Sequence, residues 1–231
     1  MRTIFEEEHD LFRASFRDFV DNEMVPRFDE WETAGVMDRQ VYADAASYGF
    51  VGFNFPERHG GAGVIDFRFN AIIAEELARG NLGGAGNGMT LVNDITTPYF
   101  LEYCNDDQAE RWMPGLATGE LISAIAMTEP GTGSDLAGIQ STAVRDGDDF
   151  ILNGSKTFIT NGINSDLVIV VCRTNPDAGR NGLSLLVVER GMAGFERGRN
   201  LDKIGQHSAD TAELRSEEHT SELQSQFRIS Y

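Results

Sequence analysis

The segment Ala124–Gly138, with the sequence AIAMTEPGTGSDLAG, joins a strand-like start to a loop rich in glycine and hydroxyl residues. Its proline forces a turn, and Gly131 and Gly133 permit unusual backbone angles and close approach of a ligand. Thr128, Ser134 and nearby backbone N–H groups would then face one spot. This arrangement suits a polar, partly anionic ligand, although an ordinary glycine-rich connection between strands has a similar composition.

Two later segments add to this pattern. Asn153–Gly162, with the sequence NGSKTFITNG, reads as a strand ending in an aromatic, an apolar and a hydroxyl residue. Asp210–Leu214, with the sequence DTAEL, follows Lys203-Ile204-Gly205. Together with the first segment they resemble signature segments of the acyl-CoA dehydrogenase family, in which the first two bind the flavin. The sequences of these segments are most similar to those of the long-chain branch. The resemblance covers most of residues 4–214.

The resemblance implies FAD as the cofactor. Backbone groups at Met127 and the hydroxyl of Thr128 would bond the pyrimidine side of the flavin ring, Phe158 would pack on that ring, and Thr160 would lie near its N5 atom. Many relatives have an aromatic residue in place of Ile125 and tryptophan in place of Phe158, which leaves the branch open. The implied cofactor-binding positions are Ile125, Ala126, Met127, Thr128, Gly133, Ser134, Phe158, Ile159 and Thr160.

The resemblance also implies an acyl-CoA substrate. Ser134 would sit near the flavin pyrophosphate and the acyl-CoA, while Arg180 and Asn181 would contact the CoA portion. The family desaturates fatty acyl-CoA: a hydride passes to flavin N5, and a glutamate of a C-terminal helical domain takes the α proton. We expect the chain to be truncated before that domain, so no catalytic base is assigned. Glu129 and Glu213 are interpreted as structural.

For the full-length protein the resemblance implies electron transfer to an electron-transferring flavoprotein and assembly as a homotetramer. Two alternatives remain open. One is an acyl-CoA oxidase or flavin monooxygenase of the same superfamily, which oxygen reactivity would distinguish. The other is a non-catalytic flavin-binding module, since the domain with the glutamate base is missing from the chain.

Other sites that bind phosphate or metal are not supported. No glycine pair completes the i, i+2, i+5 spacing of a dinucleotide fingerprint, and Gly154-Ser155-Lys156-Thr157 lacks the upstream glycine of a phosphate loop. The four histidines are scattered and the two cysteines form no zinc spacing, so no metal site is predicted.

Charge and cysteine content exclude further classes. The 231 residues carry 19 basic and 37 acidic side chains, a formal charge of −18, with no basic cluster for nucleic acid or an anionic membrane. There is no apolar run long enough to span a membrane and no secretory signal. Two cysteines favour a reducing compartment, and we expect a cytoplasmic protein.

In the first half of the chain, before these segments, the apolar residues recur at helical spacing. Thr3 and Glu6 have capping-box spacing, and Phe12, Phe16, Phe19 and Val20 share one helical face. Further helices are expected after Asp38 to Gly49, after Asp66 to Gly80, from Met89 to Tyr103, and from Asn105 to near Gly115. Residues 1–121 are therefore predicted to form an N-terminal all-α helical domain.

The second half reads as short strands. Candidates are Ile122–Met127, Ser141–Arg145, Phe150–Ile159, Asp166–Arg173 and Leu183–Glu189. Their spacing predicts an antiparallel β-barrel or sandwich over residues 122–214, and the family resemblance favours the barrel. The fold class is thus α+β, lacking the C-terminal helical domain of the family.

The end of the chain departs from the family pattern. After Leu214 an apolar strand would normally follow, but Arg215–Ser225 reads RSEEHTSELQS. We interpret residues 215–231 as a non-family tail that resembles translated sequencing-adapter DNA. A genuine polar tail is the alternative.

Overall fold

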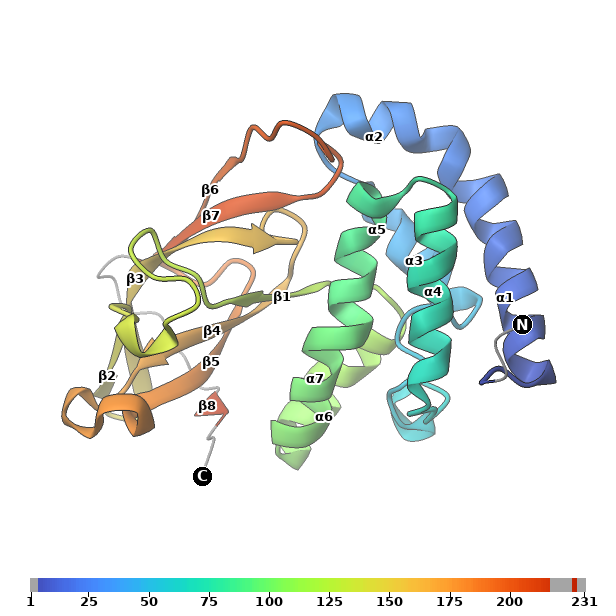
Figure 1. Ribbon diagram of the computed structural model, residues 1–231. Helices are drawn as coiled ribbons and strands as arrows, with labels where there is room; N and C mark the ends of the chain where they lie inside the picture. Colours follow the sequence, from blue (N-terminus) through green and yellow to red (C-terminus); the bar gives the residue numbers. More distant parts are fainter. Residues whose placement is uncertain (1–3, 217–225, 228–231) are drawn as a thin grey trace.

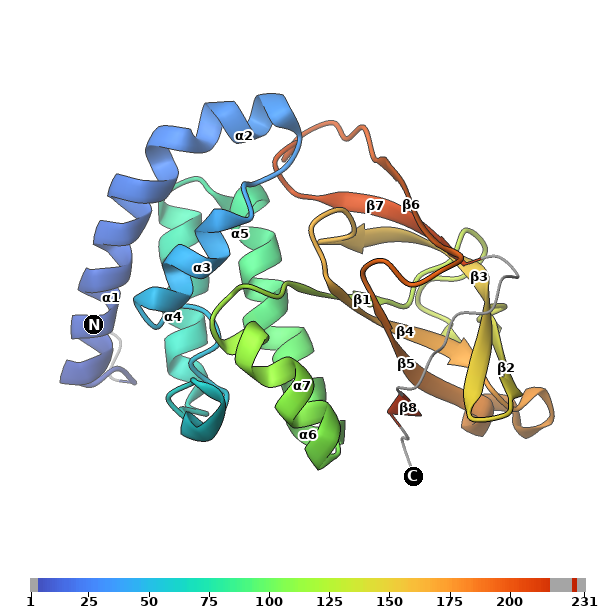
Figure 2. The ribbon, with the colours of Figure 1, turned by 180° about the vertical axis from the view of Figure 1, so that it is seen from behind.

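The computed structural model describes residues 4–216 and 226–227 and divides them into a helical half and a sheet half (Figure 1). The view from behind shows the same division, with β1 running from the helices into the sheet (Figure 2). This confirms the predicted order, a helical domain followed by a β domain. No helix of the described residues is long and apolar enough to cross a membrane.

The helical half contains seven α-helices, two π-helical segments and two short 3₁₀ turns among the described residues. The α-helices are α1 Glu7–Phe19, α2 Phe28–Ala34, α3 Gln40–Ser47, α4 Phe67–Arg79, α5 Gly83–Thr90, α6 Thr97–Tyr103 and α7 Asp106–Ala117. The others are η1 Val20–Met24, η2 Val25–Arg27, η3 Glu57–His59 and η4 Leu91–Thr96.

Side-chain caps fix the starts of two helices, α4 and α7. Asp66 accepts a hydrogen bond from the backbone N of Arg68 at 2.9 Å, as predicted for the start of α4. Asn105 forms a reciprocal capping box with Gln108 at the start of α7. Thr3, the predicted first cap, lies outside the described residues.

The start of α1 is capped by residues other than the predicted pair. Glu6 is its N-cap and forms the capping box with His9, three residues later. The predicted capping box joined Thr3 to Glu6, which made Glu6 its last residue. In the structure Glu6 is its first residue. The apolar face is as predicted, because Phe16, Phe19 and Val20 are buried.

The helix expected from Met89 begins six residues earlier, at Gly83, despite four glycines in its first six positions. Glycine costs about 1 kcal/mol against alanine inside a helix, but at Gly88 it has a packing role. A Cβ there would lie 2.2 Å from both the Asn161 Oδ1 and the Tyr42 Oη atoms. Close contact with the rest of the fold therefore outweighs local propensity.

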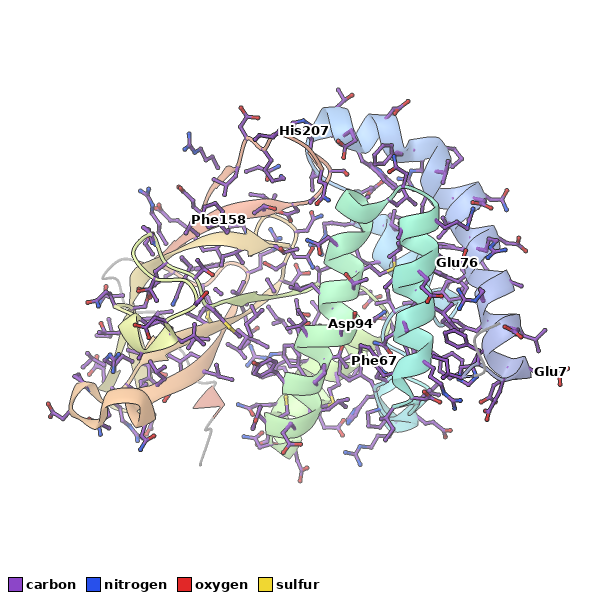
Figure 3. All side chains as sticks on the ribbon, in the orientation of Figure 1. Glu7, Phe67, Glu76, Asp94, Phe158 and His207 are labelled. Carbon is purple, nitrogen blue, oxygen red and sulfur yellow. The ribbon has the colours of Figure 1, made fainter. Side chains whose placement is uncertain are left out.

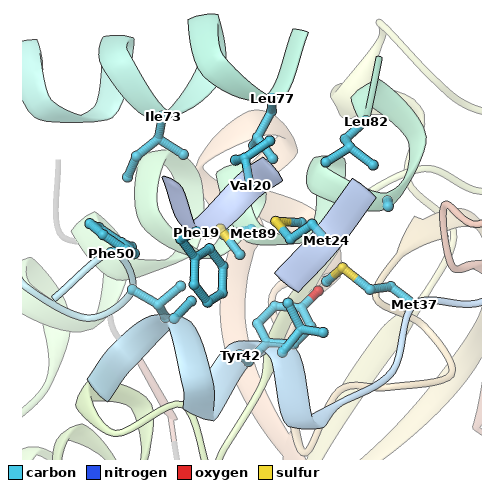
Figure 4. Packing of buried hydrophobic residues seen from close by; sticks show 14 of the residues in the cluster. Phe19, Val20, Met24, Met37, Tyr42, Phe50, Ile73, Leu77, Leu82 and Met89 are labelled. Carbon is cyan, nitrogen blue, oxygen red and sulfur yellow. The ribbon is translucent and has the colours of Figure 1, made fainter. Parts of the chain in front are cut away.

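A buried apolar cluster holds the helices together (Figure 4). It takes one face from each of α1, α3 and α4, and Figure 4 labels its central members: Phe19, Val20, Met24, Met37, Tyr42, Phe50, Ile73, Leu77, Leu82 and Met89. A second cluster joins α6 and α7 to one face of β4 and β5, so the two halves share a core.

The sheet has eight strands among the described residues, in the order β6-β7-β3-β2-β4-β5-β8, with β1 paired to β4. Their bounds are β1 Ser123–Ala126, β2 Thr142–Asp146, β3 Asp149–Thr160, β4 Leu167–Arg173, β5 Leu183–Glu189, β6 Phe195–Asn200, β7 Thr211–Ser216 and β8 Gln226–Phe227. The five predicted strands are all present, whereas β6, β7 and β8 were not predicted as strands.

Most pairings are antiparallel, as predicted, but β1 lies parallel to β4, and Thr142 of β2 makes a single parallel pair with Arg173 of β4. The reason lies at the junction of the two halves. The carboxylate of Asp166, just before β4, accepts a hydrogen bond from the backbone N of Ile122, just before β1, at 2.9 Å. Both strands start from this point and must therefore run in the same direction.

The expected end of the β domain at residue 214 falls inside β7, which continues through Ser216. Arg215 pairs with Ser155 of β3 and Glu196 of β6. Gln226–Phe227 adds a short strand beside β5. The other residues of the segment interpreted as foreign lie outside the described part of the chain.

Candidate functional site

The two glycine- and hydroxyl-rich segments lie against each other. The backbone N of Thr157, in β3, donates to the carbonyl oxygen of Thr128, just after β1, at 2.9 Å. The Lys156 Nζ atom also donates to the Met127 carbonyl oxygen at 3.0 Å. Segments 29 residues apart are therefore joined at the end of β1, as a shared ligand site requires.

A buried ion pair fixes this junction. Glu129 is 6% exposed and Lys156 is 3% exposed, and their charged atoms lie 2.9 Å apart. The same carboxylate accepts the backbone N of Gln140 at 2.7 Å, the Ser141 backbone N at 2.9 Å and the Ser141 hydroxyl at 2.5 Å. Glu129 thus ties the start of the loop to its end, which agrees with its interpretation as structural.

The surroundings of the pair shift the pKa values of both groups. Burial alone would raise the pKa of Glu129, but the hydrogen bonds from Lys156, Ser141 and the backbone outweigh burial and bring it to about 2. Burial lowers the pKa of Lys156, and Glu129 opposes that change. Four donors therefore bond to this carboxylate, which is 6% exposed, and this agrees with a structural role.

The third segment supports the second. Asp210 accepts the backbone N of Ile163 at 2.9 Å and that of Asn164 at 2.6 Å, while its carbonyl oxygen accepts the backbone N of Asn161. Burial raises the pKa of this carboxyl. The three segments separated in the sequence thus form one connected structure.

Phe158 stands out in this structure. The pairing of β3 with β7 shifts register between Lys156 and Ile159, and Phe158 lies in that bulge with φ +59°. Its side chain is 67% exposed, on the part of β3 marked in Figure 3. A bulky residue in the left-handed region is uncommon and strained. Here the strained backbone carries an aromatic ring that is largely exposed among the described residues.

Three hydroxyl groups of the first two segments make no hydrogen bond among the described residues. No hydrogen bond within the described residues uses the hydroxyl of Thr128, Ser134 or Thr160, and each of these residues is at least partly exposed. At Gly133, in the same loop, a Cβ would meet nothing within 4 Å. The loop is therefore open on its outer side.

The remaining predicted cofactor-binding residues form two groups, one partly buried and one fully buried. Ile125 and Met127 are partly buried. The side chains of Ala126 and Ile159 are 0% and 2% exposed and belong to the core inside the sheet. A ligand could meet Ala126 and Ile159 only through their backbone.

Two of the three predicted substrate residues, Arg180 and Asn181, lie in another loop, η6 Pro176–Gly182, whereas Ser134 lies in the first segment. Arg173, which sequence reasoning missed, connects this loop to the first segment, because its guanidinium donates to the carbonyl oxygens of Gly179 and Ala137 at 2.8 and 2.9 Å. Asn181 is exposed. The side chain of Arg180 lies outside what the structure describes.

Asn161 is a second residue that sequence reasoning missed. It has φ +61° and is buried. Its amide accepts from the Tyr42 hydroxyl at 2.9 Å and donates to the carbonyl oxygens of Gly88 and Ser123 at 3.1 Å each. It links the end of the second segment to the helical half and to β1. Its place in the turn Thr160-Asn161-Gly162, at the end of a predicted strand, is the sequence signal that could have identified it.

A possible metal cluster occurs away from this region. The ligand atoms of Glu6, Glu8 and His9 lie within 4.8 Å of one another. The Nδ1 atom of His9 accepts the Glu6 backbone N, and its Nε2 atom lies 3.4 Å from Asp66. Both ring nitrogens therefore have protein neighbours, which fits a helix cap.

Comparison with known proteins matches this architecture to one family. Residues 6–120 match the model of the acyl-CoA dehydrogenase N-terminal domain, and residues 124–218 match that of its middle domain. The chain therefore belongs to the acyl-CoA dehydrogenase family.

Individual relatives support the same assignment. The long-chain specific acyl-CoA dehydrogenase, mitochondrial, of Sus scrofa is 49% identical over 216 residues, covering 93% of this chain and 50% of the relative. An acyl-CoA dehydrogenase structure from Geobacillus kaustophilus has a TM-score of 0.92 at 44% identity, covering 98% of this chain and 60% of that one.

A third relative was solved with FAD bound. The Bacillus anthracis acyl-CoA dehydrogenase complexed with FAD has a TM-score of 0.86 at 29% identity, covering 96% of this chain and 38% of that one. The chain spans about half the length of the curated relatives it matches.

Proposed function

We propose that the chain is the helical and β portion of an FAD-dependent acyl-CoA dehydrogenase that desaturates fatty acyl-CoA at the α,β position. The observation that carries this proposal is the exposed, strained Phe158 ring beside the joined loops. An exposed aromatic ring, together with unbonded hydroxyls in the two joined segments, suits a flat heteroaromatic ring with polar edges. The residues present therefore fit FAD.

When bound, FAD would supply the hydride acceptor at its N5 atom. Phe158 would pack against the ring and exclude water from it. The hydroxyls of Thr128 and Thr160 would orient its polar edge, while Ile125, Met127 and the open turn at Gly133 would border it. Such donors stabilise charge that develops on the flavin, and their fixed backbone avoids reorganisation during the reaction.

On this proposal Ser134, Arg180 and Asn181 lie toward the phosphate and CoA portions of the ligands. The base that takes the α proton belongs to a further helical domain of the whole protein, outside residues 1–231. The division into residues 1–121, 122–214 and a non-family tail also remains a proposal. The named relatives that are long-chain enzymes favour fatty acyl groups as the substrate class.

We further propose that the whole protein is a homotetramer that passes electrons to an electron-transferring flavoprotein. The low cysteine content supports a reducing compartment, such as the cytoplasm. An oxidase, or a chain that binds flavin without catalysis, remains the second candidate because the exposed Phe158 surface would serve either.

The test is titration of FAD into the 231-residue chain, followed by flavin fluorescence. Phe158→Ala should weaken binding about tenfold, since it removes an aromatic contact and its buried area. Phe67→Ala, at a ring 62% exposed in the helical half, is the matched control and should leave FAD binding unchanged. Equal affinities for the wild type and Phe158→Ala would contradict the flavin assignment.

Activity needs a second measurement. In a chain extended to the length of its relatives, a saturated fatty acyl-CoA should bleach the flavin absorbance without oxygen. Rapid production of hydrogen peroxide in air would instead favour an oxidase. No bleaching with any acyl-CoA, despite FAD binding, would favour the non-catalytic alternative.

A further inference from the structure

Lys156 makes a contact that its ion pair with Glu129 does not explain. The Nζ atom donates to the carbonyl oxygen of Met127 at 3.0 Å and to the Glu129 carboxylate at 2.9 Å. An ammonium group has three hydrogens and can serve both acceptors at once. Both members of the ion pair are almost fully buried, so water screens the lysine charge much less than it screens a surface charge.

The carbonyl that accepts this hydrogen bond belongs to the peptide group between Met127 and Thr128. A trans peptide group is planar, and its N–H points in the direction opposite to its C=O. Because the carbonyl oxygen faces the buried Lys156, the N–H of Thr128 points away from the ion pair. No hydrogen bond among the described residues uses this N–H, and Thr128 is partly exposed.

The backbone on the C-terminal side of this N–H is fixed. The carbonyl oxygen of Thr128 accepts the backbone N of Thr157 at 2.9 Å, and the backbone N of Glu129 donates to the Thr132 carbonyl oxygen at 2.8 Å. With the bond from Lys156 to Met127, these contacts hold the peptide group on both sides. A donor held in this way does not have to reorganise when negative charge develops beside it.

The charge of Lys156 changes the strength of this donor. A cation bonded to the oxygen of a peptide group draws electrons toward that oxygen and leaves the hydrogen on the nitrogen more positive. Connected hydrogen bonds strengthen one another by this polarisation. The Thr128 N–H is therefore a stronger donor than an ordinary amide, and the gain is largest toward an acceptor that carries negative charge.

We propose that Lys156 is a positioning residue that acts on the flavin ring through the peptide between Met127 and Thr128. This inference rests on the proposed function. Adding two electrons and one proton to the ring gives it one further negative charge, and the polarised N–H of Thr128 favours that form. Lys156 thus raises the affinity of the chain for reduced FAD relative to oxidised FAD, while Glu129 keeps the ammonium group against the carbonyl.

The test compares the affinities of the 231-residue chain for oxidised FAD and for FAD reduced by dithionite, obtained from the potentials of bound and free FAD. The double variant Glu129→Gln with Lys156→Gln removes both charges and keeps neutral hydrogen-bonding groups, so no unpaired charge is buried. Its ratio of reduced to oxidised affinity should be at least about fivefold lower than that of the wild type. This corresponds to about 20 mV for a two-electron couple.

Lys203, the other lysine of the sequence, provides a matched control. Its Nζ atom donates to the carbonyl oxygen of Ala209 at 2.8 Å, outside the two joined segments. Lys203→Met therefore also removes a lysine–carbonyl bond, but it should leave the affinity ratio within about twofold of the wild type. An equal fall in the ratio for Lys203→Met would overturn the inference, because the effect would then not depend on the bond to Met127.

A second measurement needs no cofactor. The amide nitrogen resonance of a residue moves downfield when the carbonyl of the preceding residue accepts a hydrogen bond. In the FAD-free chain, the Thr128 amide nitrogen should therefore move upfield in the double variant and in Lys156→Met. It should stay in place in Lys203→Met, where the Asp210 amide nitrogen should move instead.

The outcomes separate this inference from the flavin proposal. Bound FAD with an unchanged affinity ratio, or a Thr128 resonance that does not move when Lys156 is replaced, would overturn this inference alone. Absence of FAD binding to the wild type would overturn the flavin proposal and this inference with it. If the double variant no longer binds FAD, the Thr128 resonance decides: an upfield shift supports the polarised peptide, and an unchanged position shows that Lys156 acts only on the fold.

Discussion

Removing the charge of Glu129 should have a large effect on stability, and its size can be worked out from the structure. The folded pKa of about 2, against an ordinary 4.5, corresponds to about 3 kcal/mol at neutral pH. Independently, breaking a buried ion pair from one side costs about 3–5 kcal/mol. Glu129→Gln should therefore lose about 3–5 kcal/mol of unfolding free energy at pH 7, measured by urea denaturation.

The pH dependence gives this prediction a signature. The folded pKa of Glu129 lies below its unfolded value, so its contribution is complete above about pH 4.5 and is lost as the pH falls toward 2. The difference between wild type and Glu129→Gln should therefore narrow over that range. A difference that stays constant down to about pH 3 would refute the reasoning.

Two further variants complete the test. Glu213→Gln, in β7 of the same sheet, removes a partly exposed carboxylate that lies 3.8 Å from Arg215 and should cost under about 0.5 kcal/mol. Lys156→Met should be destabilising alone, but the double variant with Glu129→Gln should cost less than the sum of the two. Additive costs, or a loss below about 1 kcal/mol for Glu129→Gln, would show that the pair does not hold the loop.

Three other variants or reagents test neighbouring features. Phe158→Asn should raise the unfolding free energy, measured in urea, by about 0.5–1 kcal/mol. Asparagine tolerates the left-handed backbone better than phenylalanine, and the exposed ring contributes little to the core. A lower unfolding free energy for this variant would contradict the prediction. Gly88→Ala would place a carbon 2.2 Å from two buried polar atoms and should cost about 2–3 kcal/mol in urea, whereas Gly131→Ala has open space and should be neutral. Burial raises the thiol pKa of Cys104 and Cys172 to about 12. A disulfide reagent at pH 8 should therefore label both thiols at least about 100-fold faster in the unfolded chain than in the native chain. Rapid labelling of the native chain would contradict the raised pKa values.

Much of the fold follows from local patterns. The strand Leu183–Glu189 is predicted with its observed bounds, because an apolar run ends there at a charged residue. The cap at Asp66 and the stop at Gly80 also agree with the structure. These features depend on residues close in sequence, which pattern reasoning can use.

The missed features depend on distant partners. The strand Phe195–Asn200 is polar and half-exposed, and it is held by its pairing with β7. The alternation of β3 places Lys156 on the inner face with Phe150 and Leu152, yet only the fold brings Glu129 to it. The parallel β1 likewise results from the shared anchor at Asp166.

The candidate site is outlined by the sequence, but its support is not. The segments that carry Thr128 and Phe158 can be identified from their residues, whereas the bulge that exposes the ring and the turn at Asn161 cannot. Both involve positive φ at residues other than glycine, which local propensity disfavours. Tertiary hydrogen bonds maintain these angles.

The links between the two halves set an order for assembly during synthesis. The helix α3 is complete once Ser47 has been made, yet the partner of the Tyr42 hydroxyl comes 119 residues later and that of Arg39 comes 127 residues later. Domains generally fold from the N-terminus as the ribosome delivers them. The emerging helical half must therefore wait with the Tyr42 hydroxyl unmatched, and with Arg39 lacking its carboxylate partner, until the end of β3 and the start of β4 leave the exit tunnel. Slowing translation between these points would prolong the interval in which a chaperone could bind that surface.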